Sequence, residues 1–136
     1  MDLLKAIKRH EGFRSKVYKC TEGYDTIGYG FAIKDLILDE DVAEIILMKK
    51  INKLLERILI AFPWFNDSPN PVKFVVSNMC YQLGITGFSK FKKTIYYLET
   101  EQYEEASAEM LDSLWAKQTP ARAKELSEII KSIQAN

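Results

Sequence analysis

Three residues near the start of the chain have side chains that could act together in catalysis. Glu11, Cys20 and Thr26 lie in the stretch HEGFRSKVYKCTEGYDT, which continues directly into IGYG. A carboxylic acid can donate a proton, a thiolate can accept a hydrogen bond or attack, and a hydroxyl can hold water. Any chemistry here has to use one acid, one thiol and one hydroxyl, without an evident second carboxylate.

Glu11 is expected at the carbonyl end of a short helix over residues 2–11. Asp2 can cap this helix and Gly12 can end it. Helical spacing places Glu11 on the apolar stripe, which we expect to be buried. Burial and the helix dipole both disfavour a carboxylate anion, and a carboxyl kept protonated near neutral pH is what a general acid requires. The stripe consists of Leu3, Leu4, Ile7 and Glu11.

Neither Cys20 nor Thr26 predicts a catalytic role when it is considered alone. Cys20 is then a small buried hydrophobe, although Lys16 and Lys19 could lower the pKa of its thiol. His10 is expected on the helix surface, so no Cys–His dyad is evident. Thr26 alone is an ordinary strand residue. Function is therefore predicted from the set rather than from any single member.

The stretch after residue 12 predicts a β-hairpin. KVYKC and YDTIGYG flank TEG, with Gly23 in the turn. Alternation places Thr26, Gly28 and Gly30 on one face, where a ligand could approach closely, and Asp25 on the other. Asp25 therefore points away and is not taken as the missing carboxylate.

Composition limits the classes of function that remain. The 136 residues suit one compact domain, and 19 basic residues balance 19 acidic ones, so charge gives no support for nucleic-acid binding. An anionic partner would have to be held by a local patch. One histidine and two cysteines make a metal site or a disulfide framework improbable, and we expect no metal and no cofactor. No apolar run reaches the length of a membrane span.

A long helix is predicted over residues 39–61, and its apolar face changes along its length. We interpret it as a connector between two lobes, the alternative being a core helix with one wide apolar face. Val42, Ile45 and Ile46 point one way, whereas Leu47, Ile51, Leu54 and Ile58 point nearly opposite.

The remaining chain is predicted to be helical after the proline-rich loop FPWFNDSPNPV. Helices are expected from about residue 72 onward, over VKFVVSNMCYQLG, FKKTIYYLET and YEEASAEMLDSLWAK. The last helix is expected to begin with Thr119 as N-cap and Pro120 as its first residue. Its apolar stripe is Leu126, Ile129, Ile130 and Ile133.

The ordered motifs of the chain resemble those of the phage-type lysozymes, the endolysin muramidases of glycoside hydrolase family 24. Glu-x8-Cys-x5-Thr on a helix and hairpin matches that family's Glu-x8-Asp/Cys-x5-Thr pattern, with Cys20 where many members keep a second carboxylate. NMCYQLGITGFSKF and SLWAKQTPARA resemble two later family blocks, in the same order. The resemblance therefore covers nearly the whole chain.

The resemblance implies an α+β, lysozyme-like fold in a single domain over residues 1–136. An N-terminal helix (1–12) and a small β lobe (about 13–38) would be joined by the connecting helix (about 39–61) to a helical lobe (about 62–136). The segment from residue 31 to residue 38 is shorter than in most members of the family, which implies a smaller β lobe. Phe31 stands where many members have histidine.

The resemblance also implies hydrolysis of the β-1,4 bond between N-acetylmuramic acid and N-acetylglucosamine in peptidoglycan. Glu11 would be the general acid, and Cys20 and Thr26 would hold the attacking water in an inverting scheme. Arg122 matches the arginine that lies against the acid, where its charge would oppose the effects of burial and the dipole. Sugar-cleft positions match Tyr81, Gln82, Thr94 and Glu109.

Three alternatives stay open on the sequence. A thiolate could attack the sugar itself; a lytic transglycosylase could use Glu11 alone and release a 1,6-anhydro sugar; or the chain could be a wall-binding module without activity. Because no signal peptide is evident, we expect accumulation in the host bacterial cytoplasm until a holin opens the membrane. We also expect a monomer that acts on the periplasmic cell wall, without nucleic acid or stable membrane insertion.

Overall fold

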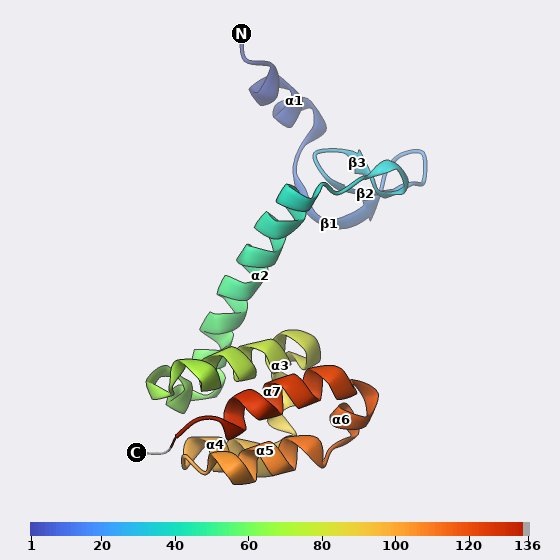
Figure 1. Ribbon diagram of the computed structural model, residues 1–136. Helices are drawn as coiled ribbons and strands as arrows, with labels where there is room; N and C mark the ends of the chain where they lie inside the picture. Colours follow the sequence, from blue (N-terminus) through green and yellow to red (C-terminus); the bar gives the residue numbers. More distant parts are fainter. Residues whose placement is uncertain (135–136) are drawn as a thin grey trace. The chain divides into compact units, whose positions relative to one another are not determined.

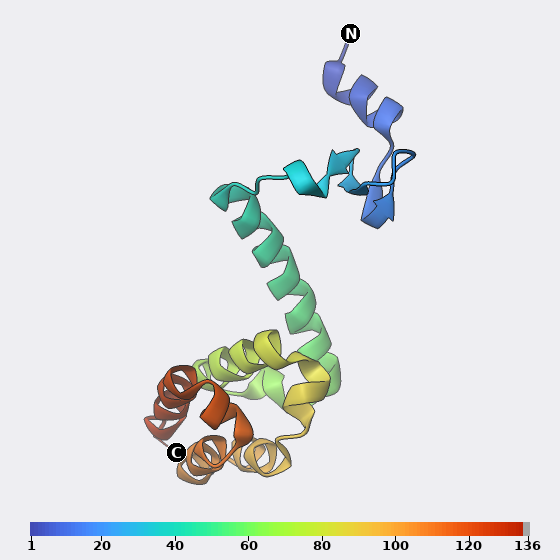
Figure 2. The same cartoon turned by 90° about the vertical axis from the view of Figure 1, so that its right-hand side faces the viewer.

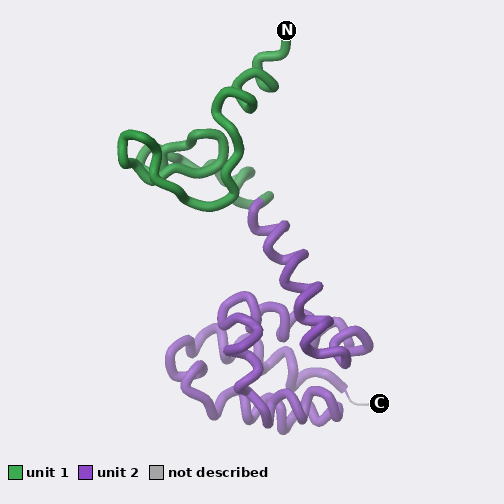
Figure 3. Tube along the Cα trace, turned by 180° about the vertical axis from the view of Figure 1, so that it is seen from behind, with its two compact units in different colours: residues 1–45 green, residues 46–136 purple. Residues whose placement is uncertain are grey.

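The protein is described by a computed structural model that covers residues 1–134 (Figure 1). It divides into two compact units, residues 1–45 and 46–136, shown in separate colours in Figure 3. Residues 135 and 136, the end of the expected helical lobe, lie outside the described residues. Helices and a small antiparallel sheet are both present, which confirms the expected α+β class.

Unit 1 begins with the expected short helix, α1 (Leu3–Glu11). The Asp2 side chain accepts a hydrogen bond of 3.1 Å from the backbone N–H of Lys5, which caps the helix. Gly12 ends it with φ +70°, and its N–H donates to the carbonyl of Lys8. These two local signals place Glu11 in the last turn of α1.

A three-stranded antiparallel sheet in the order β1-β2-β3 follows α1. The expected hairpin consists of β1 (Arg14–Lys19) and β2 (Asp25–Gly28), and Gly23 lies in its turn with φ +84°. Tyr18 pairs with Thr26. The third strand, β3 (Phe31–Ala32), was not predicted because two residues are too few to show alternation. A 3₁₀ turn, η1 (Ile33–Asp35), follows it.

Unit 1 has almost no interior of its own. Thr26, at 4% exposure, is its only buried residue among those the structure describes. The stripe on α1 was expected to be buried, but nothing within unit 1 buries it: Leu3, Leu4, Ile7 and Glu11 are exposed. The physical reason is that the short sheet places no apolar surface over α1.

The long helix α2 (Glu40–Ala61) matches the predicted connector, and the boundary between the units falls inside it, after Ile45. The C-terminal apolar group is confirmed at Ile58, which is fully buried, and at Leu54, which packs against the core of unit 2, whereas Leu47 is exposed. The N-terminal apolar group differs from expectation, because Val42, Ile45 and Ile46 are exposed in the structure.

Unit 2 contains a hydrophobic core built by helices. After the 3₁₀ helix η2 (Pro63–Asp67) come α3 (Asn70–Ser89), α4 (Lys92–Glu99), α5 (Tyr103–Leu111), α6 (Leu114–Gln118) and α7 (Pro120–Lys131). Figures 1 and 2 show α7 packed between α3 and α5. Buried apolar side chains from α3, α5 and α7 meet there, among them Val75, Met79, Ala106, Met110, Leu126 and Ile130.

Aromatic rings continue this core towards α6. Phe88 is fully buried, with its ring centroid 5.5 Å from that of Phe62 in an edge-on contact. Phe91 stacks on Phe88 at 6.2 Å and meets the edge of Trp115 at 6.0 Å. Replacing the fully buried Phe88 by alanine would lower the free energy of unfolding by about 3–5 kcal/mol.

The helices of unit 2 differ from the sequence expectation in three places. Gly84, the expected helix end, is a kink with φ +77°, and helix resumes to Ser89. YEEASAEMLDSLWAK forms two helices rather than one, because Ser113 starts α6 by accepting from the N–H of Ala116. Thr119 is at the N-cap position as predicted, yet its hydroxyl donates to the carbonyl of Trp115 instead of capping α7.

The apolar stripe of α7 is confirmed, with Leu126 and Ile130 buried and Ile129 and Ile133 packed against the core. Among residues 1–134, no helix combines the length and the apolar character that crossing a bilayer demands.

The unequal burial of the two units predicts unequal stability of the corresponding fragments. Residues 46–136 contain every residue of the described hydrophobic core, so this fragment should unfold cooperatively on heating. Residues 1–45 bury too little surface to fold alone and should show no cooperative transition. Circular dichroism of both fragments tests this, and a sigmoidal melt of residues 1–45 would contradict it.

Candidate active site

The carboxylate of Glu11 lies against the turn between β2 and β3. A methyl group added to Gly30 would lie 2.7 Å from Glu11 Oε2 and 3.3 Å from its carboxyl carbon. Only a residue without a side chain permits this approach, and Gly30 also has φ +75°, a conformation that other residues rarely adopt. The exposed side chain of Glu11 therefore passes close to the backbone of the β2–β3 turn.

The face of β2 that was expected to be free of side chains is partly covered. A methyl group on Gly28 would lie 2.7 Å from the ring of Phe31, and Gly30 is covered by Glu11. The glycines therefore accommodate the protein's own ring and carboxylate. The expectation of an open surface here is wrong, because β3, absent from the sequence prediction, brings Phe31 back over the strand.

Thr26 is the one buried residue of this sheet, and its hydroxyl already has a partner. Thr26 Oγ1 donates a hydrogen bond of 3.0 Å to the carbonyl of Tyr24. While its proton is used in this way, the hydroxyl oxygen accepts further hydrogen bonds; turned towards Cys20, the same proton stabilises the thiolate instead. A water molecule beside Thr26 would therefore be the donor.

Cys20 is partly exposed, and the pKa of its thiol is lowered from the ordinary value. The largest cause is hydrogen bonding from the backbone of Tyr24, followed by the backbone of Glu22; the side chain of Thr26 contributes a smaller lowering. The suggestion that Lys16 and Lys19 lower this pKa is wrong, since the lowering comes from turn backbone groups. Cys20 and Thr26 therefore belong to one local cluster.

Asp25 is correctly excluded from this cluster. Its carboxylate forms an ion pair of 2.8 Å with Lys19 Nζ on the exposed side of the hairpin. Asp25 is exposed while its neighbour Thr26 is buried, as strand alternation predicts.

Arg122 of α7 is held by α3 within unit 2. Its Nε donates to Asn78 Oδ1 at 2.8 Å and its Nη2 to the carbonyl of Asn78 at 3.3 Å. Two bonds to one residue fix the plane of the guanidinium and leave further N–H groups to donate elsewhere. Arg122 and Glu11 belong to different units, so their pairing stays a prediction.

Gln82 is fixed in a similar way by a distant residue. Its Oε1 accepts a hydrogen bond of 2.9 Å from the indole Nε1 of Trp115, which is 4% exposed. The amide NH₂ of Gln82 then points its two donors away from the indole. Sequence reasoning missed both partners, Asn78 and Trp115. A signal existed, because Asn78 and Gln82 are amide residues four positions apart on one predicted helix, which places them on the same face.

The four expected sugar-binding residues do not share one groove. Thr94 and Glu109 line a groove of about 600 Å³ together with Trp115, and Thr94 is 2% exposed. Tyr81 is half exposed and lines a different groove, of about 470 Å³, between α2 and α3. Gln82 is connected to the first groove only through its hydrogen bond to Trp115.

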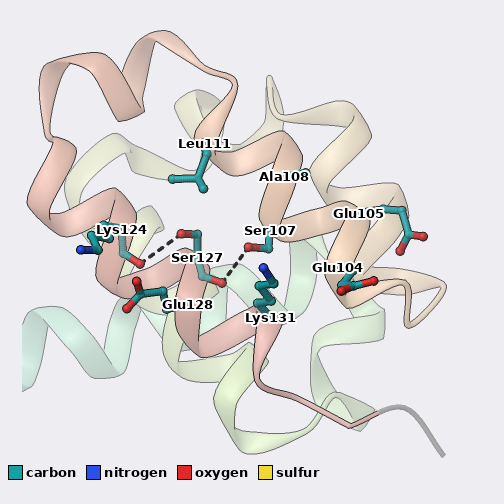
Figure 4. A pocket seen from close by; sticks show the side chains of 9 residues that line it. All are labelled: Glu104, Glu105, Ser107, Ala108, Leu111, Lys124, Ser127, Glu128 and Lys131. Carbon is teal, nitrogen blue, oxygen red and sulfur yellow. Dashed lines mark hydrogen bonds between the residues drawn. The ribbon is translucent and has the colours of Figure 1, made fainter.

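Another groove, of about 820 Å³, contains none of the expected site residues. It lies between α5 and α7, and Figure 4 shows acidic and basic side chains around it, including Glu104, Glu128, Lys124 and Lys131. Its floor is structural: the hydroxyl of Ser107 donates to the carbonyl of Ser127 at 2.9 Å and ties the two helices together. Over residues 1–134, no group of three or more His, Cys, Asp or Glu side chains is arranged to hold a metal ion.

Comparison with known proteins relates this arrangement to a family. The phage lysozyme family matches residues 8–131. A probable T4-type lysozyme 1 of Dictyostelium discoideum is 28% identical, over 93% of this chain and 91% of that protein. A second probable T4-type lysozyme from the same organism is 26% identical, with the same coverage of both chains.

A third relative is the pre-baseplate central spike protein Gp5 of Enterobacteria phage T4, which is 31% identical over 96% of this chain and 28% of its own length. The alignment with the first Dictyostelium protein runs over 155 positions, more than the 136 residues of this chain. That relative therefore has internal residues that this chain lacks. The chain belongs to the phage lysozyme family and is a peptidoglycan-hydrolysing glycoside hydrolase, a muramidase.

Proposed function

We propose that the chain hydrolyses the β-1,4 bond between N-acetylmuramic acid and N-acetylglucosamine, with Glu11 as the general acid. The observation that carries this proposal is the approach of the Glu11 carboxylate to Gly30, in the same small unit as Cys20 and Thr26. A carboxyl group in this small unit can deliver its proton to a bond that lies within hydrogen-bonding reach, which is the geometric condition for acid catalysis.

In the proposed reaction, Glu11 gives its proton to the glycosidic oxygen as the bond to the anomeric carbon breaks. Water attacks that carbon from the opposite face of the sugar, which is the inverting course. The water donates one hydrogen bond to Thr26 Oγ1, whose own proton is held by the carbonyl of Tyr24. Its second proton passes towards the Cys20 thiolate, whose lowered pKa favours the form that accepts it.

Residues of unit 2 are proposed to hold the substrate and to adjust the acid. The guanidinium of Arg122, oriented by Asn78, would stabilise the Glu11 anion left after proton transfer. The free NH₂ of Gln82 offers two donors to sugar hydroxyl or acetamido oxygens. Tyr81 offers an exposed ring on which a sugar face can pack.

The general acid can be tested by replacing Glu11 with Gln, which keeps the shape and removes the transferable proton. We expect hydrolysis of purified peptidoglycan to fall by about 100- to 10,000-fold. Glu44→Gln, which alters another exposed glutamate of unit 1, serves as the matched control and should stay near wild type. A Glu11→Gln variant with normal activity would remove the assignment.

The mass of the product separates hydrolysis from a transglycosylase reaction. Hydrolysis by the wild-type chain should leave a reducing N-acetylmuramic acid. An anhydro product, lighter by one water, would contradict the role proposed for Cys20 and Thr26.

The role of the thiol predicts that Cys20→Asp keeps substantial activity, whereas Cys20→Ala loses about 100-fold, because a carboxylate can accept the proton of water and a methyl group cannot. Equal and nearly normal rates for both variants would make Cys20 a bystander.

Alkylation provides a second measurement on the unmodified chain. Cys80 is 1% exposed and burial raises the pKa of its thiol to about 12, so Cys20 should react first. Because the pKa of Cys20 is lowered in the fold, its alkylation rate should rise at lower pH in the native chain than in denaturant.

The contact between Glu11 and Gly30 predicts that Gly30→Ala reduces activity at least tenfold, because the new methyl group must displace the carboxylate. Gly23→Ala is the matched control. Gly23 also has a positive φ, so an alanine there carries a similar strain of about 1–2 kcal/mol, yet its methyl group meets nothing within 4 Å. Comparable kcat losses in the two variants would show that strain, rather than displacement of Glu11, is responsible.

A further inference from the structure

The groove between α2 and α3 has a distinctive charge. Lys50, Lys53 and Arg57 line it from α2, and Tyr81 and Gly84 line it from α3. No aspartate or glutamate lines it. Every residue of this cationic groove belongs to unit 2.

The three cations share one face of α2. At 100° per residue, positions 50, 53 and 57 fall within an arc of about 60°. Like charges three and four residues apart on a helix repel one another and reduce its stability. The arrangement therefore costs folding free energy, and nothing in the core of unit 2 requires it, since all three side chains are exposed.

None of the three cations is neutralised by the part of the chain that the structure describes. Within residues 1–134 the only ion pair is Lys19 with Asp25, on the hairpin of unit 1. Helix α3, which forms the opposite wall, contains one lysine and no acidic residue. Glu56, the acidic residue nearest in sequence, does not line the groove.

The groove between α5 and α7 provides a contrast within the same unit. Its lining mixes Glu104, Glu105 and Glu128 with Lys124 and Lys131, so the two signs largely compensate (Figure 4). A lining with cations and no acidic residue is therefore a property of the cationic groove and not of every groove in unit 2.

The shape of the cationic groove indicates an extended ligand rather than a small ion. Seven residues of helix separate Lys50 from Arg57, about 10 Å along the axis. A methyl group at Gly84 would meet no atom within 4 Å, so the space above this wall is open. The half-exposed ring of Tyr81 adds an apolar surface beside the charges.

We propose that the cationic groove binds carboxylates of the stem peptides on a peptidoglycan strand, and so holds the polymer through residues other than those proposed to cleave it. The proposal rests on the peptidoglycan-directed function above, since peptidoglycan is a polymer with repeated peptide carboxylates. Arg57 can bind a carboxylate through two parallel N–H bonds, and the lysines act as point charges along the strand.

The test compares two triple variants that lose the same charge. Lys50→Gln/Lys53→Gln/Arg57→Gln removes the cations of the groove. Lys117→Gln/Lys124→Gln/Lys131→Gln removes three exposed lysines of α6 and α7 and is the matched control. Binding to insoluble peptidoglycan, freed of wall-linked phosphate polymers, is measured by sedimentation at 0 °C, in the wild-type and the Glu11→Gln backgrounds.

The groove variant should bind about tenfold more weakly than wild type at low salt, and the control should change less than twofold. The difference should disappear at high salt and on peptidoglycan whose carboxylates have been converted to amides. The groove variant should melt at or above the wild-type temperature, because repulsion is relieved.

Equal binding by the two triple variants would overturn the proposal. A difference between them that persists on amidated peptidoglycan would also overturn it, as would a difference that appears only on walls retaining phosphate polymers. A deficit in binding DNA with no deficit on peptidoglycan would overturn it as well. Hydrolysis by the Glu11→Gln variant would refute the proposed acid without altering the sedimentation result, so the two failures are distinguishable.

Discussion

The close approach of the Glu11 carboxylate to Gly30 is the constraint on which the candidate site in unit 1 depends. It requires α1 to end at Gly12, the hairpin to turn at Gly23, and the β2–β3 turn to carry no side chain at position 30. None of these conditions involves a hydrophobic core, and unit 1 buries only Thr26 among its described residues. The backbone that carries the acid is therefore set by caps and glycines rather than by packing.

Local features of the fold could be predicted from the sequence because they depend on neighbouring residues. The Asp2 cap, the stop at Gly12 and Pro120 at the start of α7 each follow from backbone rules acting within one turn of helix. Features that depend on distant residues were missed. Asn78 meets Arg122 across 44 positions, and Gln82 meets Trp115 across 33, separations for which periodicity gives no information.

The environment of the candidate site residues differs from the environment that the sequence predicted. Placing Glu11 on the apolar stripe led to an expectation of burial, whereas the structure leaves the whole stripe exposed. Amphipathic spacing identifies a face and does not identify what covers it. For the Cys20 thiol, too, the expected and the observed environments differ. Lysines adjacent in sequence suggested an ionic cause for the lowered pKa of Cys20, whereas backbone groups of the turn are responsible.

The net charge of this protein is zero, so any attraction to an anionic polymer has to come from local groups of charges. A neutral chain gains little from long-range attraction to an anionic polymer, since the field of a few surface charges fades within about 8 Å at physiological salt. Three unpaired cations in one groove of unit 2 act only after contact, when a strand already lies on the surface. Their contribution should therefore appear in how long the polymer stays bound and in its orientation, while the rate of encounter should be that of a neutral protein.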